Sequence, residues 1–139
     1  VNIGESNNFI GESAGIANTG DFNNSFGYFS GDSNAGNYNN LFGFSAGTDN
    51  FGDFNNFFGY QAGAFYNKGD FNEFIGYRAG SNLNSTSSVA LGSEALYGSH
   101  GTEYISLNNV AVGYRAGYAS DDGSGNNILI GYRHRRQST

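Results

Sequence analysis

Self-similarity at a period of about 16 residues is the feature that most constrains the fold of this chain. A unit of the form Asn-Asn-x-Φ-Gly-Tyr-x-Ala-Gly, in which Φ is apolar, recurs eight times. Successive units are 16, 16, 16, 17, 16, 21 and 18 residues apart, counted between their central glycines, which are Gly11, Gly27, Gly43, Gly59, Gly76, Gly92, Gly113 and Gly131. Such a period is typical of architectures in which identical units stack on one another.

The length of the unit selects among the repeat architectures. Sixteen residues are too few for a helix pair or a propeller blade, but they hold two short strands and two turns. The 23 glycines also disfavour helix, and glycine at fixed places suits turns with positive φ. We therefore predict an all-β fold, a parallel β-solenoid of eight coils over residues 1–132. The basic segment 133–139 departs from the pattern and is expected to be a cap or a linker in a longer chain.

Alternation within the unit predicts which side chains face the coil interior. The residue before each central glycine, the mostly aromatic residue after it, and the alanine two further on share one parity, which we assign to the interior. The residue two before the glycine has the opposite parity, yet it is a large apolar residue in five units. A strand that is apolar on both faces needs a cover on both. We therefore predict a homo-oligomer whose interface is formed by Phe9, Leu41, Phe57, Phe74 and Leu129.

Asparagines recur just before the apolar part of each unit. If the coils stack in register, these amides form columns in which each hydrogen-bonds to the next coil, as in cross-β ladders. We expect a structural role for the main column, which comprises Asn7, Asn23, Asn39, Asn55, Asn72, Asn109 and Asn127.

Two later units resemble a known family of repeats. Ser88-Val-Ala-Leu-Gly-Ser-Glu-Ala95 and Asn109-Val-Ala-Val-Gly-Tyr-Arg-Ala116 look like the head repeats of trimeric autotransporter adhesins of the YadA type. The resemblance implies a left-handed β-roll and a homotrimer. The first five units are more aromatic, with Asn or Glu73 where Val89 and Val110 stand later. They are similar to repeats of bacterial surface filaments and of phage-type tail fibres.

Residues that carry catalysis or bind metals are sparse. The chain has no cysteine, and His100 and His134 lie in an atypical loop and in the tail. Asp21, Asp53 and Asp70 follow glycines, but calcium-binding rolls need a nine-residue repeat rather than 16. We therefore expect no enzymatic activity, no cofactor and no metal.

One insertion interrupts the rhythm between Gly92 and Gly113, where the spacing is 21 residues. Insertions in solenoids map to surface loops that often bind partners. The candidate contact residues there are Tyr97, His100, Glu103 and Tyr104; the alternative is a tolerated insertion without a partner.

Charge and repetition together suggest a function. The net charge of −6 disfavours nucleic acid as a partner, and no apolar run is long enough to insert in a membrane. We expect a segment of a secreted adhesin or extracellular filament at the bacterial cell surface that attaches to a host or prey surface, a matrix protein or a glycan. A tail-fibre segment is the first alternative. A carbohydrate-binding module that uses exposed tyrosines is the second, and it requires that Tyr60 and Tyr77 are not buried.

Overall fold

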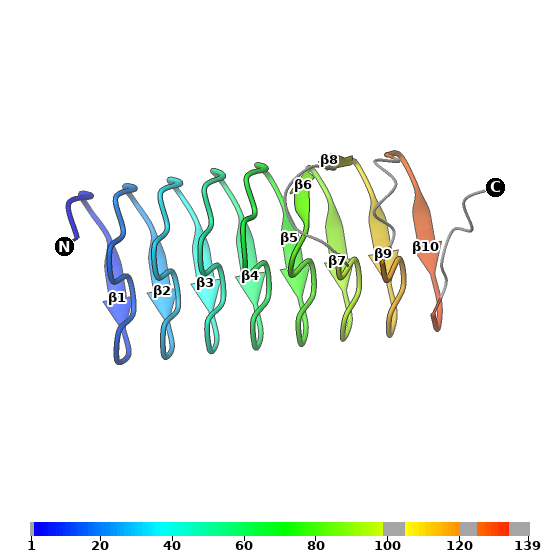
Figure 1. Cartoon of the computed structure of the whole chain (residues 1–139), viewed down its shortest axis with the longest axis horizontal. Helices are drawn as coiled ribbons and strands as arrows, with labels where there is room; N and C mark the ends of the chain where they lie inside the picture. Colours follow the sequence, from blue (N-terminus) through cyan, green and yellow to red (C-terminus); the bar gives the residue numbers. More distant parts are fainter. Residues whose placement is uncertain (1, 99–104, 120–124, 134–139) are drawn as a thin grey trace.

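The computed structural model describes residues 2–98, 105–119 and 125–133, and the chain forms a parallel β-solenoid. Its main sheet has eight strands in the order β1-β2-β3-β4-β5-β7-β9-β10, all parallel, one from each repeat (Figure 1). These strands are β1 (Asn8–Ile10), β2 (Asn24–Phe26), β3 (Asn40–Phe42), β4 (Asn56–Phe58), β5 (Glu73–Ile75), β7 (Val89–Leu91), β9 (Val110–Val112) and β10 (Ile128–Ile130). A second parallel pair joins β6 (Asn84–Thr86) to β8 (Ile105–Leu107). The predicted fold class and its parallel register are confirmed.

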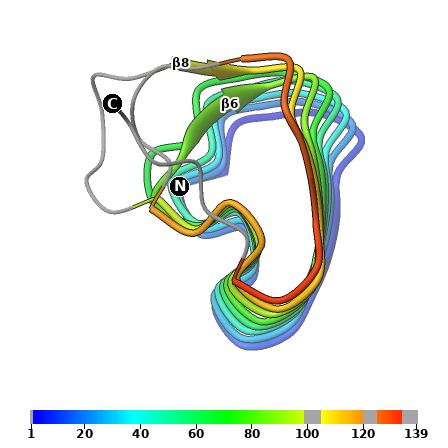
Figure 2. The same cartoon turned by 90° about the vertical axis from the view of Figure 1, so that its right-hand side faces the viewer.

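Each strand has three residues, and most coils have one strand rather than the two that we predicted. A residue in the left-handed region precedes each strand of the main sheet by two positions, as with Phe54 (φ 57°) before β4. The central glycine then follows the strand with a φ that only glycine adopts readily, as with Gly59 (φ 137°). Four residues lie between these two bends, and the last three of them form the strand. Viewed along the axis, successive coils superpose on one bent outline (Figure 2).

The central glycines form one column, as the repeat predicts. A Cβ added to Gly59 would lie 2.4 Å from the carbonyl oxygen of Gly76 in the next coil, and Gly43 meets Gly59 in the same way. The column needs glycine because the backbones of neighbouring coils leave no room for a side chain.

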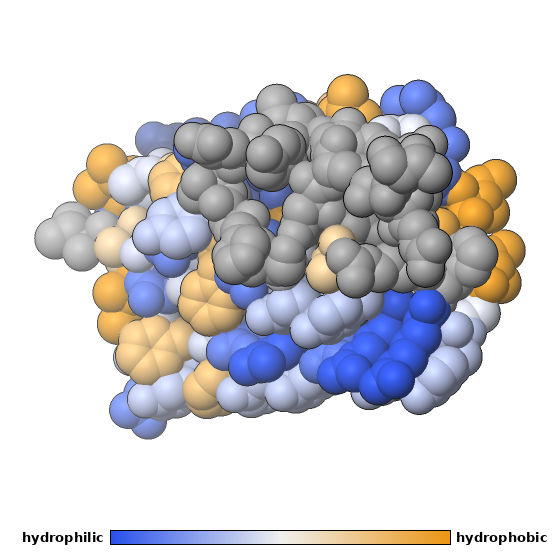
Figure 3. Space-filling view, turned by 45° about the vertical axis from the view of Figure 1, so that its right-hand side comes forward, coloured by the Kyte–Doolittle hydropathy of each residue, from blue (hydrophilic) through white to orange (hydrophobic). Residues whose placement is uncertain are grey.

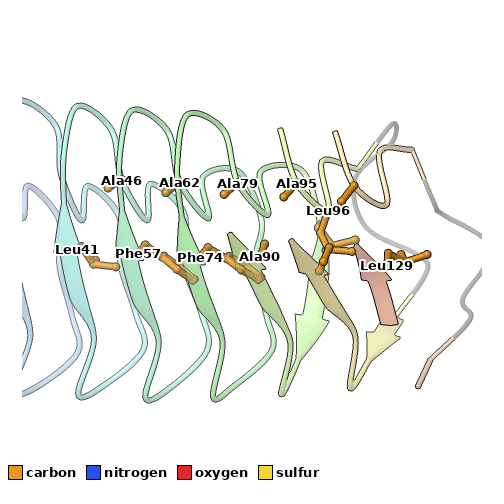
Figure 4. Packing of buried hydrophobic residues seen from close by; sticks show 13 residues of the cluster. Leu41, Ala46, Phe57, Ala62, Phe74, Ala79, Ala90, Ala95, Leu96 and Leu129 are labelled. Atoms are coloured by element: carbon orange, nitrogen blue, oxygen red, sulfur yellow. The ribbon is translucent and has the colours of Figure 1, made fainter. Parts of the chain in front are cut away.

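The side chains in the middle of the strands form the apolar core, and this overturns our interface assignment. Phe57 and Phe74 have 0% of their surface exposed within the single chain, and their rings stack with centroids 5.1 Å apart. Leu41 and Leu129 are also buried, and Phe9 in the first strand is half-buried. These five residues therefore fill the coil interior and cannot form a surface between copies. The alanines of the repeat pack beside them, as with Ala46, Ala62 and Ala79 (Figure 4).

Buried asparagine ladders fill the rest of the interior, and they confirm the structural role that we predicted. In the main column, Asn39, Asn55 and Asn72 donate their backbone N–H groups to Asn Oδ1 atoms of the preceding coil, at 2.8–2.9 Å. The column runs unbroken from Asn7 to Asn127, with Ser88 substituting for one asparagine.

A second buried column comprises Asn18, Asn34, Asn50 and Asn67, whose side-chain amides bond to one another across the coils. This column was not predicted from the sequence. Because both sides of each amide are used, the buried polar groups carry little desolvation penalty.

Candidate contact surface

The outward side of the main sheet carries a continuous apolar column. It consists of the last residue of every strand: Ile10, Phe26, Phe42, Phe58, Ile75, Leu91, Val112 and Ile130. Phe26, Phe42 and Phe58 stack with ring centroids 4.6 and 4.9 Å apart, and Phe58 is 38% exposed. We predicted this column to be interior, and that prediction is wrong. The sheet has one buried face, and the middle residue of each strand occupies it.

A second exposed column lies at the bend after the central glycines. It contains Tyr28, Phe44, Tyr60, Tyr77, Ser93, Tyr114 and Tyr132. The rings of Tyr60 and Tyr77 are stacked at 5.3 Å, and these residues are 41% and 45% exposed. Our assignment of the tyrosines to the core is therefore wrong, whereas that of the alanines is correct. Alternation does not continue through a glycine with positive φ and a left-handed residue such as Gln61 (φ 52°).

A third aromatic column was missed from the sequence. Phe22, Tyr38, Phe54 and Phe71 precede the strands, are exposed, and stack at 4.9–5.1 Å with ring planes within 4° of parallel. All four have left-handed backbones, with φ between 56° and 59°. That conformation costs a non-glycine residue roughly 1–2 kcal/mol. The recurring phrase Asp-Phe-Asn, at residues 21–23, 53–55 and 70–72, was the available signal.

The stacking fixes which part of each ring meets the solvent. Because the rings of one column lie face to face along the rod, as Phe44 does on Tyr60 at 4.9 Å and 6°, their faces cover one another. The exposed part of each residue is therefore mainly the edge of its ring. A sugar that stacks on a ring face therefore finds free faces only where a column is interrupted.

Arginine accompanies tyrosine at the bend of the C-terminal half. The triplet Gly-Tyr-Arg occurs at residues 76–78, 113–115 and 131–133. Each guanidinium carbon lies over the ring of the preceding tyrosine, at 5.4 Å for Arg78, 5.1 Å for Arg115 and 5.5 Å for Arg133. Strongly hydrophilic residues gather along the lower edge of the C-terminal half, where the strands end (Figures 1 and 3).

Arg115 is the most connected of these arginines. Its Nε donates a hydrogen bond to the Glu94 carboxylate in an ion pair, and this bond raises the pKa of the Arg115 guanidinium. The same guanidinium lies 5.0 Å from the ring centroid of Tyr118, which stacks on Tyr97. An aromatic and ionic cluster therefore fixes the side chain of Arg115.

The candidate contact loop is described only in part. Tyr97 is half-buried, and its hydroxyl group accepts a hydrogen bond of 3.0 Å from Asn82 Nδ2. His100, Glu103 and Tyr104 lie outside the described residues, as does His134. Tyr97 thus contacts the preceding coil through Asn82. The contact role of the insertion stays a prediction.

The recurring aspartates have structural partners in this fold. Asp21, Asp53 and Asp70 each accept a hydrogen bond from a backbone N–H of the preceding coil, at 2.7–2.8 Å. Within residues 2–98, 105–119 and 125–133, no three acidic, histidine or cysteine side chains are grouped to hold a metal. The same residues contain no helix with the length and apolarity needed to cross a membrane.

No protein-family model matches the chain, and neither curated proteins nor solved structures gave a match. The resemblance to adhesin head repeats therefore stays a prediction from the sequence.

Proposed function

We propose that this chain is a non-enzymatic structural and adhesive segment of a secreted adhesin or extracellular filament, and that it works as a homo-oligomeric rod at the cell surface. The observation that carries the proposal is the exposed apolar column from Ile10 to Ile130. Eight such residues at steps of about 4.8 Å make a stripe of about 34 Å, which exceeds the isolated apolar exposure normal for a soluble surface.

A second copy of the chain is the partner that best fits this stripe. In the apolar column and in the outward column that starts each strand, Glu73 is the only charged side chain, although the chain carries a net charge of −6. Association through this face therefore brings together the least charged part of an acidic molecule. A copy also has the same axial period, so that every coil meets an equivalent coil along the whole rod.

Two other functions fit part of the structure. A tail-fibre segment would use the same rod and the same outer face in a virion. A carbohydrate-binding module is favoured by the exposure of Tyr60 and Tyr77, which that hypothesis required. It is disfavoured by their stacking, because ring faces that cover one another are closed to a sugar ring.

The adjacent residues Phe57 and Phe58 provide the test, since one faces the core and the other faces outward. Phe58→Asp should leave the circular dichroism spectrum unchanged and lower the oligomeric mass in analytical ultracentrifugation. Phe57→Asp should abolish the folded spectrum, because it buries a charge in an apolar interior. A wild-type monomer, or a Phe58→Asp variant of full oligomeric mass, would contradict self-association through this face.

A further inference from the structure

Three of the four basic residues in the described ranges lie on one line. Arg78, Arg115 and Arg133 occupy the position after the exposed tyrosine column, whereas Lys68 lies elsewhere. Backbone hydrogen bonds at this position run from Glu94 N to Tyr77 O, from Arg115 N to Ser93 O and from Arg133 N to Tyr114 O. Arg78, Glu94, Arg115 and Arg133 therefore stand on four successive coils. The spacing is about 9.6 Å from Arg78 to Arg115 and about 4.8 Å from Arg115 to Arg133.

The guanidinium groups on this line are held in place. Each lies over the ring of its neighbouring tyrosine, and each backbone is fixed in the left-handed region, with φ of 53°, 56° and 49°. Arg78 Nε also donates to Gln61 Oε1 at 2.9 Å. Arginines fixed in this way lose less conformational freedom on binding an anion than free side chains do.

Glu94 lies on the coil between those of Arg78 and Arg115, and its carboxylate forms an ion pair with Arg115. This ion pair shows that an anion can be accommodated at Arg115 on this surface. It also means that an external anion must compete with Glu94 there. Within the described residues, Arg115 uses only its Nε–H in a hydrogen bond, so that the other donors of the guanidinium stay available.

We propose that this line, from Tyr77-Arg78 to Tyr132-Arg133, binds a linear anionic polysaccharide laid along the rod. The inference rests on the proposed adhesive function and names the ligand class. Guanidinium groups bind carboxylates or sulfates, and the hydroxyl groups of the neighbouring tyrosines can bind sugar hydroxyls. Nucleic acid fits less well, because duplex DNA carries about one charge per 1.7 Å, which a single row of arginines cannot match. The acidic remainder of the chain also repels so dense a polyanion.

Binding of the full chain to immobilised alginate, dextran sulfate and neutral dextran, measured by surface plasmon resonance, tests the proposal. We expect binding to alginate, dextran sulfate or both, which separates a carboxylate ligand from a sulfate ligand, and none to dextran. The double variant Arg115→Gln, Arg133→Gln should bind about fivefold more weakly or worse. Glu94→Gln should bind about threefold more tightly, because it removes the internal competitor.

Lys68→Gln is the control for net charge: it removes one positive charge, against two in the double variant, from an exposed site off the line. It should bind like the wild type, and circular dichroism should show all variants folded. The proposal is overturned by binding to neither anionic polymer, by Lys68→Gln acting like the arginine variants, or by Glu94→Gln weakening the interaction. A lower oligomeric mass for the arginine double variant would also overturn it, by assigning the line to self-association.

Retention of chain-coated beads under flow separates this inference from the adhesive function. Beads that adhere to alginate or dextran sulfate equally well with and without the two arginines would refute the polysaccharide line and leave the adhesive function standing. Beads that adhere to no surface would refute both.

Discussion

The aromatic ring of Phe57 lies so close to Gly63 that a Cβ on this glycine would come within 2.3 Å of the ring. The next coil repeats the relationship between Phe74 and Gly80, at 2.2 Å. Where the core residue is the small Ala90, the position of the glycine is taken by Leu96, which is buried. In these three coils one large residue, from either of two positions, thus fills the interior (Figure 4). The coils of Ser25 and Ala111 have glycine at the second position as well, and leucines of neighbouring coils approach those glycines.

Gly63→Ala should therefore destabilise the fold strongly. The substitution combines overpacking against Phe57, typically 1–3 kcal/mol, with a left-handed backbone (φ 59°), roughly 1–2 kcal/mol, so we expect a loss of about 2–5 kcal/mol. Chemical denaturation followed by circular dichroism measures it. Gly131→Ala is the control, because its Cβ meets nothing within 4 Å and carries only the backbone cost.

The double variant Phe57→Ala, Gly63→Leu copies the arrangement of Ala90 and Leu96. We expect it to be more stable than Phe57→Ala alone, because the introduced leucine side chain would fill the cavity that the smaller alanine leaves. A double variant no more stable than Phe57→Ala would show that a large side chain at position 63 cannot replace the one at position 57 in this coil.

Asn55 belongs to the buried main column, whereas Asn56 belongs to an outer ladder, in which Asn40 Nδ2 donates to Asn56 Oδ1 at 2.7 Å and Asn56 Nδ2 donates to Glu73 Oε1 at 2.6 Å. Asn55 is fully buried; its Oδ1 accepts from Asn72 N at 2.9 Å, and its Nδ2 donates to Gly69 O at 3.1 Å. Asn55→Leu leaves the N–H of Asn72 and the carbonyl of Gly69 without this partner. It should lower the free energy of unfolding by about 2–6 kcal/mol. Asn56→Val should cost less than about 1 kcal/mol, because Val89 and Val110 occupy the same half-buried column. Equal losses in equilibrium denaturation would contradict the assignment of the buried ladder.

Ser25 offers a stabilising change. Its Oγ is buried without a hydrogen-bond partner among the described residues, in a column otherwise filled by apolar side chains. Ser25→Ala should raise the free energy of unfolding by about 1 kcal/mol, since it removes an unpaired polar group. Ser85→Ala should lower it, because Ser85 Oγ donates to Ser106 O at 3.1 Å. The two melting temperatures should move in opposite directions.

Asp49 should make stability depend on pH. Burial, with repulsion from Asp32 as the smaller cause, raises the pKa of the Asp49 carboxyl above its ordinary value of 3.8. The folded state then binds this proton more tightly than the unfolded state does. The resulting stabilisation is present below pH 3.8 and is lost as the pH rises through the folded pKa. At neutral pH, Asp49→Asn should therefore be more stable than the wild type by about 0.5 kcal/mol.

The advantage of Asp49→Asn should shrink as the pH falls toward 3.8, which thermal melts at several pH values would show. Part of it will persist at all pH values, because asparagine tolerates the left-handed backbone at this position (φ 55°) well. An advantage that grows on acidification would contradict the direction of the pKa shift.

The repeat made the coil, its parallel register and its glycine column predictable, because each depends only on the period. It did not make the direction of the side chains predictable. We carried strand alternation from Phe58 through Gly59 to Tyr60, but the chain bends there, and Phe57 rather than Phe58 is interior. A second error followed from the first, since a buried Phe58 left no place for Phe57 except an interface between copies.

The arginine line was within reach of the sequence, because Gly-Tyr-Arg recurs three times. Its partner Glu94 was not, since the pairing of Glu94 with Arg115 depends on coils that are 21 residues apart at that point. Only the stacking of the coils shows which side chains are neighbours across an irregular spacing.

Strands β1 and β10 lie at opposite ends of the rod (Figure 1), which has a mechanical consequence. A force that pulls these ends apart loads the terminal coils first, and each coil is held only by its neighbours. A released coil of 16 residues lengthens from about 4.8 Å to roughly 50–58 Å. Each step must break a whole layer of backbone and asparagine hydrogen bonds before the next begins. The rod should therefore yield in equal steps under load, dissipating energy while most of its length stays folded.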